Sequence, residues 1–140
     1  MKGIDANIIV YAVNSDLPEH SCSKGLLEEV ARGLEPIAIP NIVFMESYHA
    51  LVYRYKFNSI NVKERLIAIL ESENVVVLDI TTTTILYAFE IASHYYTGGR
   101  DSLIAANLLE NNIKEIYSHD GAFDSIKEIN RIDPIKAIIK

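Results

Sequence analysis

Several features that mark common classes of protein are missing from this sequence. No apolar run reaches the roughly 18 residues that a membrane-spanning helix requires, and no basic segment followed by a long apolar stretch indicates a signal peptide. The lone Cys22 has no second cysteine with which to form a disulfide, which fits a reducing compartment. We therefore expect a cytoplasmic protein without a membrane partner.

The sequence also lacks an excess of positive charge. Its formal net charge of −6 argues against a protein that binds nucleic acid by bulk electrostatics. The four histidines, at positions 20, 49, 94 and 119, show no zinc-ligand spacing. An acidic metal site is nevertheless permitted, because bound cations reverse the local sign of the charge.

The size and composition predict one compact domain that covers residues 1–140. About half of the 140 residues are apolar, which is enough for a single core and excludes a disordered chain. We find no internal repeat, low-complexity tract or linker at which the chain would divide.

Segments with strand and helix patterns alternate along the chain. The clearest strand is 75–78, with four apolar residues between Asn74 and Asp79. Further strands are expected at 2–5, 36–40 and 115–118, and helices at 7–13, 19–32, 41–56, 61–71, 82–94, 100–111 and 125–130. This alternation predicts a parallel sheet with helices on both faces.

Two local features of the predicted helices are specific enough to check. Asn61 and Glu64 have the spacing of a capping box, so Asn61 is expected to begin its helix. In helix 82–94, Ile85, Phe89 and Ala92 are expected to face the core.

Four acidic residues lie at boundaries between polar and apolar sequence. Asp5 and Asp120 each follow a predicted strand, and open α/β sheets bind ligands at the carboxyl ends of their strands. Glu46 has apolar neighbours in its helix, so it is half buried or points into a cleft. Asp101 opens a helix, where the dipole favours the ionised form by roughly 0.3–1 kcal/mol.

Convergence of these acids would require a compensating charge. Two carboxylates about 4 Å apart repel by roughly 4 kcal/mol at an effective dielectric constant near 20, and protonation or a cation relieves the repulsion. Carboxylate oxygens suit Mg²⁺ or Mn²⁺. Such ions promote hydrolysis of a phosphodiester by water without a nucleophilic serine or cysteine.

Each candidate taken alone also has a purely structural explanation. Asp5 and Asp120 would be turn residues, and Asp101 would be an N-cap. Asn7 would cap the first helix, and Asp124 would cap the helix at 125–130. The order of the acids along the chain is what favours a site over these explanations.

The segments around the acids resemble the PIN domain and, within it, the VapC-like toxin ribonucleases. The matching segments are residues 5–7, 41–46, 100–106 and 118–124. Each motif alone is weak, but the family places one acid in each, and here they occur in order over essentially the whole chain. Two departures are mild: Ala6 replaces a more usual hydroxyl residue, and Ser118 stands where threonine is common.

The resemblance implies a fold and a catalytic site. The fold is a three-layer α/β/α sandwich with a central parallel sheet, and the activity is that of an Mg²⁺- or Mn²⁺-dependent endoribonuclease. The catalytic, metal-binding residues implied are Asp5, Glu46, Asp101 and Asp120. Asn7 would support Asp5 by hydrogen bonds, and Asp124 would be either a further metal ligand or a helix cap.

The resemblance also implies partners: an RNA substrate, a second copy in a homodimer, and a small antitoxin protein. Apolar residues in the helices at 41–56 and 61–71 favour a dimer independently. Arg100 is interpreted either as a phosphate contact or as a solvated surface residue. Tyr95 and Tyr96 would stack on a base or simply pack, and His119 is a weaker candidate for a proton shuttle.

Three other functions remain open from the sequence. The chain could process RNA outside a toxin–antitoxin pair, or serve as a non-catalytic PIN-like binding scaffold, although none of the four acids is missing. A phosphatase or phosphoacceptor receiver would use an aspartate after the first strand as a nucleophile. A receiver would also have a second acid nearby, and residues 1–10 contain only Asp5.

Overall fold

A parallel sheet forms the centre of the computed structural model, which describes residues 1–135. Its five strands lie in the order β3-β2-β1-β4-β5, and every neighbouring pair is parallel. The strands are β1 (Lys2–Ile4), β2 (Ile37–Pro40), β3 (Val75–Leu78), β4 (Glu115–Tyr117) and β5 (Asn130–Ile132). The chain order therefore reverses at β1, which has β2 on one side and β4 on the other. Ligands bind outside the carboxyl ends of the strands at such a switch point.

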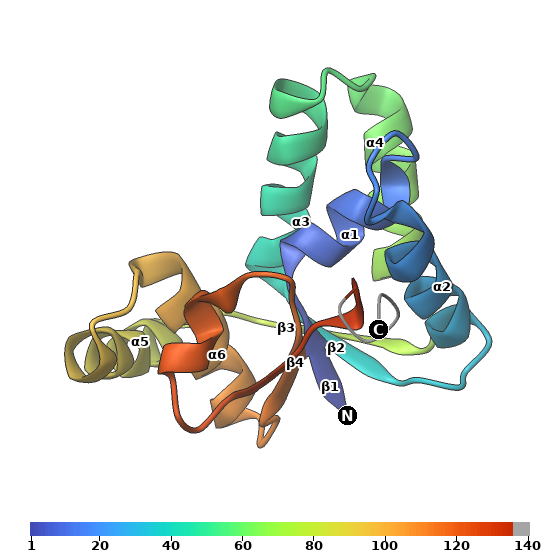
Figure 1. Cartoon of the computed structure of the whole chain (residues 1–140). Helices are drawn as coiled ribbons and strands as arrows, with labels where there is room; N and C mark the ends of the chain where they lie inside the picture. Colours follow the sequence, from blue (N-terminus) through green and yellow to red (C-terminus); the bar gives the residue numbers. More distant parts are fainter. Residues whose placement is uncertain (136–140) are drawn as a thin grey trace.

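Helices cover both faces of this sheet (Figure 1). One side carries α1 (Ala6–Val13), α2 (His20–Ala31), α3 (Asn41–His49) and α4 (Ser59–Leu70), and the other carries α5 (Thr82–Tyr95) and α6 (Gly99–Glu110). The predicted three-layer α/β/α sandwich with a parallel sheet is confirmed. None of the helices within residues 1–135 is long and apolar enough to span a bilayer.

The central strands are apolar because both of their faces are covered. All of β2 is buried, and α6 lies directly against β1. A Cβ atom added at Gly3 would lie 2.6 Å from Cδ1 of Leu108, a fully buried side chain of α6. Glycine at this position is what allows the helix and the strand to approach so closely.

The long helix predicted at 41–56 is not regular throughout. After α3 the chain forms the π-helix η1 (Ala50–Arg54), whose wider turn changes the direction of the side chains that follow. The predicted capping box of the next helix is wrong. Asn58, not Asn61, caps α4 by accepting hydrogen bonds from the backbone N–H groups of Ile60 and Asn61.

The predicted inward face of α5 is also wrong. Ile85 is 42% exposed and Phe89 is 65% exposed, whereas Thr84, Ala88 and Ile91 are the buried residues. The Thr84 hydroxyl donates a hydrogen bond to the carboxylate of Glu110 on α6, and this contact helps set the rotation of α5 about its axis. Thr84 and Ala88, two of the small residues on the inner face, let the two helices approach closely.

The helix predicted at 125–130 is absent. A short 3₁₀-helix, η2 (Gly121–Ser125), follows β4, and the chain then enters β5, whose register pairs Ile116 with Arg131. A strand of three residues is too short to show a sequence period, so its pairing with β4 decides the conformation.

Candidate active site

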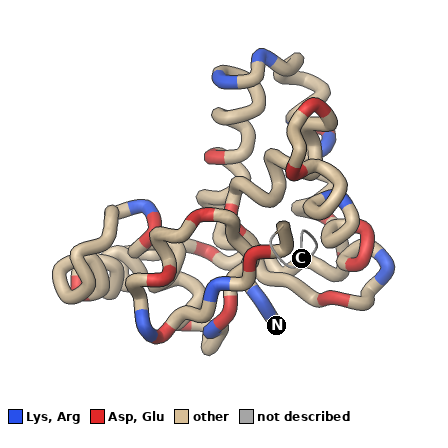
Figure 2. Tube along the Cα trace, viewed as in Figure 1, with Lys and Arg blue, Asp and Glu red and all other residues tan. Residues whose placement is uncertain are grey.

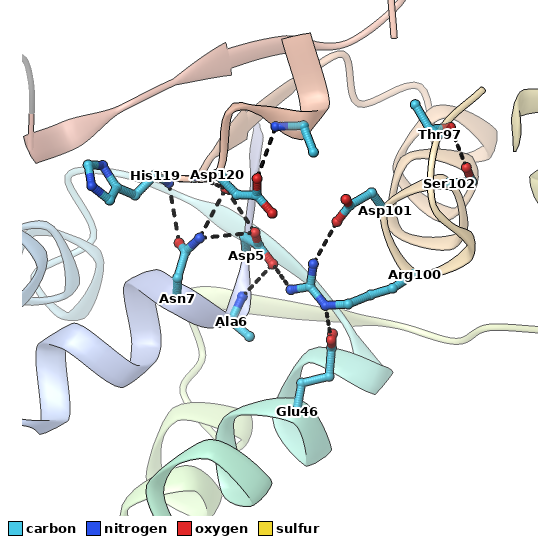
Figure 3. Close-up of polar contacts among 12 residues, drawn as sticks. Asp5, Ala6, Asn7, Glu46, Thr97, Arg100, Asp101, Ser102, His119 and Asp120 are labelled. Atoms are coloured by element: carbon cyan, nitrogen blue, oxygen red, sulfur yellow. Dashed lines mark hydrogen bonds and ion pairs between the residues drawn. The ribbon is translucent and has the colours of Figure 1, made fainter. Parts of the chain in front are cut away.

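The fold brings the four predicted acids to one edge of the sheet, around a single arginine (Figure 3). Asp5 follows β1, and Asp120 follows β4 and caps η2 through a hydrogen bond from the backbone of Ala122. Glu46 reaches the same place from α3, and Asp101 from the first turn of α6. These elements meet at the carboxyl ends of β1 and β4, which is where the sheet topology places a ligand site.

Asp5 is fully buried and each of its oxygens accepts two hydrogen bonds. Oδ1 accepts from the backbone N–H of Ala6 at 2.7 Å and from Nη2 of Arg100 at 2.7 Å. Oδ2 accepts from the hydroxyl of Ser118 at 2.8 Å and from the amide of Asn7 at 3.3 Å. The carboxylate is therefore held in one orientation by donors from opposite ends of the chain.

Asn7 and Ser118 also join the end of β1 to the end of β4. The side-chain oxygen of Asn7 accepts a hydrogen bond from the backbone N–H of His119 at 3.3 Å. The hydroxyl oxygen of Ser118 accepts one from the backbone N–H of Asp120 at 3.0 Å. The sequence indicated a hydrogen bond from Asn7 to Asp5 but assigned no contact to Ser118, whose partners Asp5 and Asn7 lie more than a hundred residues away.

Arg100 contacts three of the four acids. Its Nη2 lies 2.7 Å from Oδ1 of Asp5, its Nη1 lies 2.6 Å from Oδ1 of Asp101, and its Nε donates to Oε2 of Glu46. Burial acts to lower the pKa of Arg100, but the charges of Asp5 and Glu46 outweigh it and raise that pKa above its usual value. A permanent positive charge thus lies among the carboxylates. The sequence had led us to interpret Arg100 either as a phosphate contact or as a solvated surface residue, and neither interpretation included these ion pairs.

Two of the acids are held in unfavourable surroundings for a charge. Burial raises the pKa of Glu46, against the opposing effect of Arg100 and with a smaller contribution from Asp5. Burial likewise raises the pKa of Asp101, and the neighbouring charge of Asp120 adds to the increase. Arg100 therefore compensates only part of the electrostatic cost of gathering these carboxylates.

The donor set fits a hard divalent cation. All four candidate ligands supply carboxylate oxygens, the type that Mg²⁺ and Mn²⁺ prefer. Oε1 of Glu46 is buried without a hydrogen-bond partner among the described residues, so one oxygen is already free to bind a cation. As the side chains lie, no three acids within residues 1–135 are arranged to hold a metal. The guanidinium of Arg100 lies between them, so a metal would have to displace it.

Asp124, the fifth acid considered, makes a different contact. Its two oxygens form a bidentate ion pair with Nε and Nη2 of Arg131, each at 2.9 Å. The predicted cap of a helix at 125–130 is wrong, because there is no helix there. Both oxygens of Asp124 are therefore engaged by Arg131 rather than by the cluster of acids around Arg100.

Two other candidates have partners that the sequence did not indicate. Nδ1 of His119 lies 2.8 Å from Oδ2 of Asp133, and its ring packs edge-on against Tyr11. The hydroxyl of Tyr95 donates to Glu128 at 2.5 Å, which ties this residue to a surface contact. Tyr96 is almost completely exposed.

A cavity of about 750 Å³ opens beside the acids. Glu46, Arg100 and Asp120 line it together with aromatic residues from α1, α3 and η1. Its volume lies within the range of about 300–1,000 Å³ that is usual for ligand pockets. The cavity cannot be predicted from the sequence, because residues of separate elements form its walls.

Comparison with known proteins gives an independent description of the chain. Residues 3–129 match the PIN domain family. Ribonuclease VapC43 of Mycobacterium tuberculosis is 45% identical over 43 residues, which are 31% of this chain and 29% of that protein. The match thus spans less than a third of the length of this relative.

Solved structures resemble the whole fold. The VapC20 toxin of Mycobacterium tuberculosis, which cleaves the sarcin–ricin loop, superposes with a TM-score of 0.75 at 20% identity. That likeness covers 89% of this chain and 94% of VapC20. VapBC2 of Rickettsia felis, solved with a DNA fragment of its promoter, gives a TM-score of 0.71 at 20% identity, over 94% of this chain and 96% of that one.

Proposed function

The chain belongs to the PIN domain family, and from that premise we propose that it is an Mg²⁺- or Mn²⁺-dependent endoribonuclease that hydrolyses RNA phosphodiester bonds. The observation that carries the proposal is the convergence of Asp5, Glu46, Asp101 and Asp120 at the switch point of the sheet. A purely structural role for each acid does not account for all four meeting at one edge of the sheet, three of them on one guanidinium. A non-catalytic scaffold would have no need to retain this electrostatically costly cluster.

Each acid would have a distinct part in the reaction. Asp5 is the anchor of the site, because its four hydrogen bonds fix both oxygens before any ligand binds. Asp101 and Asp120 would complete the metal site from the facing side, and the buried Oε1 of Glu46 would add a further oxygen. When bound, the cation supplies a more acidic water and neutralises charge on the phosphate.

The remaining residues would position the reactants. Asn7 holds Asp5 and would keep the orientation of that carboxylate once Arg100 has moved away. Arg100, released from the carboxylates, would remain beside the cavity as a donor for a phosphate oxygen. Cleavage by water is expected to leave a 5′-phosphate and a 3′-hydroxyl.

We also propose that the protein is the toxin of a toxin–antitoxin pair and acts on cytoplasmic RNA. The similarity to VapC ribonucleases supports this role, and so does a toxin–antitoxin complex from Klebsiella pneumoniae among the structural neighbours. RNA processing outside such a pair is the alternative. A short gene for a DNA-binding antitoxin beside this one would favour the toxin.

A homodimer is part of the proposal. Met45 and Ile60 are exposed on the helices that the sequence predicted to carry a dimer surface, whereas Tyr48 and Phe57 pack partly against the core. The apolar surface on these helices is therefore smaller than the sequence indicated. Sedimentation that gives a monomer at micromolar concentration would contradict the dimer.

The nuclease assignment is tested by replacing single acids. Asp5→Asn and Asp101→Asn are expected to abolish Mg²⁺-dependent cleavage of RNA, because each removes a negative charge from the metal site. Asp124→Asn is the matched control and is expected to retain cleavage, because Asp124 pairs with Arg131. Circular dichroism would establish that each variant is folded, and undiminished cleavage by both site variants would refute the assignment.

A further inference from the structure

The cavity beside the acids has an aromatic wall that metal-dependent hydrolysis does not require. His49 lies at the end of α3 and Tyr53 within η1, and both line the cavity together with Glu46. The two rings face each other obliquely, with centroids 5.0 Å apart and planes inclined by 31°. This ring pair lies next to the candidate metal ligand Glu46 in the wall of the cavity.

This surface is not needed to complete the core. Tyr53 is 61% exposed, so most of its ring is in contact with solvent. The rings belong to consecutive turns, and η1, where Tyr53 lies, is a π-helix (Ala50–Arg54). Such π-helical turns are rare and occur frequently at functional sites.

A positive charge borders the same wall. Arg54 follows Tyr53, is exposed and lines the cavity. Within residues 1–135 no ion pair engages its guanidinium, whereas Arg100 and Arg131 are both occupied by carboxylates. Figure 2 shows basic positions where η1 passes toward α4, in a chain whose net charge is −6.

We propose that His49 and Tyr53 stack on one unpaired base of the RNA, next to the phosphate held at the acids, while Arg54 binds a neighbouring phosphate. This inference rests on the proposed function and assigns the residues that would hold a base beside the cleaved bond. Aromatic side chains stack on bases that are free of a duplex, and they do so without regard to sequence. A base within a duplex cannot reach the ring pair.

The absence of tryptophan from the chain makes a direct test available. Tyr53→Trp introduces a single tryptophan at the aromatic wall, which can be excited apart from the tyrosines, and Phe89→Trp places one at a similarly exposed position on α5. Each variant would be titrated in EDTA, so that metal-dependent cleavage does not consume the RNA. The ligands are a short RNA that has no self-complementarity and the same strand annealed to its complement. Single-stranded RNA is expected to quench the fluorophore at 53 but not that at 89, and duplex is expected to quench neither.

A second measurement covers the case in which the tryptophan variant does not fold. Tyr53→Ala is expected to weaken binding of the labelled single strand, followed by fluorescence anisotropy, by roughly 5- to 150-fold, and Tyr53→Phe to restore it. Lack of quenching at 53, equal quenching by duplex, or unchanged binding by Tyr53→Ala would overturn the proposal. Loss of cleavage in Asp5→Asn without any quenching would leave the nuclease assignment intact. Quenching without cleavage would instead support the base site and contradict the nuclease.

Discussion

Replacing Arg100 by glutamine tests how the carboxylates are held together in the absence of metal. The substitution leaves Asp5, Glu46 and Asp101 without the cation that contacts all three. Removing one partner of a buried ion pair costs about 3–5 kcal/mol. Arg100 is 39% exposed, so water screens part of this interaction, and protonation of Glu46 relieves more of it. We therefore expect Arg100→Gln to lower the free energy of unfolding in EDTA by about 2 kcal/mol.

The same interaction opposes metal binding in the unaltered chain. A divalent cation must displace the guanidinium, so the free energy of those contacts is subtracted from the affinity for metal. If the metal-bound states of the two proteins are equally stable, Arg100→Gln gains the difference of about 2 kcal/mol on binding, which corresponds to roughly 30-fold tighter binding of Mg²⁺. The variant would thus be less stable without metal and bind metal more tightly.

Urea unfolding in EDTA and in saturating Mg²⁺, together with calorimetric titration of Mg²⁺, measures both effects. Arg131→Gln is the control, because Arg131 pairs with Asp124 and Asp133 outside the cluster. It is expected to leave the affinity for Mg²⁺ unchanged. Unaltered stability of Arg100→Gln in EDTA, or unaltered or weaker binding of Mg²⁺, would refute the idea that Arg100 competes with the metal.

Two further predictions concern pH and packing. The raised pKa values of Glu46 and Asp101 mean that protons compete with Mg²⁺ at a higher pH than the value near 4 of exposed carboxyls. Calorimetric affinity for Mg²⁺ should therefore fall as the pH drops through these raised values. In the metal-free protein the sign is opposite: the contribution of Glu46 to stability is fully present below its unfolded pKa and is lost as the pH rises through the raised folded pKa. In urea unfolding, the free energy of unfolding of Glu46→Gln should lack this decrease with rising pH. Gly3→Ala is expected to cost about 1–3 kcal/mol in urea unfolding, because its Cβ would meet Leu108. Gly25→Ala in α2, with no atom within 4 Å of the added Cβ, should instead stabilise by about 0.5–1 kcal/mol. Equal effects of the two substitutions would contradict the packing argument.

Local sequence patterns predicted the architecture and the acids. The run of four valine and leucine residues at 75–78 matches β3 residue for residue, because β-branched apolar residues between polar flanks favour a strand, although β3 lies at the edge of the sheet and Val76 is exposed. Alternation of such runs with amphipathic segments indicated a parallel sheet before any contact was known. The acids that follow β1 and β4 were predicted to lie near each other because the carboxyl ends of parallel strands share one edge.

Tertiary contacts decided what those patterns could not show. The rotation of α5 follows from its packing on α6 and from the bond between Thr84 and Glu110, so its own apolar residues misled the assignment of its inner face. The three residues of β5 became a strand by pairing with β4. The π-helix at Ala50–Arg54 contains Tyr53, which lines the cavity. It could not be predicted, because the segment keeps the apolar pattern of an ordinary α-helix.

The electrostatics of the site likewise depends on contacts between distant residues. Arg100 stands next to Asp101 in the sequence, but its partner Asp5 is 95 residues away, and Ser118 reaches Asp5 across 113 residues. The sequence by itself determined which acids stand at boundaries between polar and apolar segments and in what order, because such boundaries are visible in the local pattern. Only the folded chain determined that one guanidinium occupies the space between three carboxylates, since this arrangement arises when β1, α3 and α6 pack together.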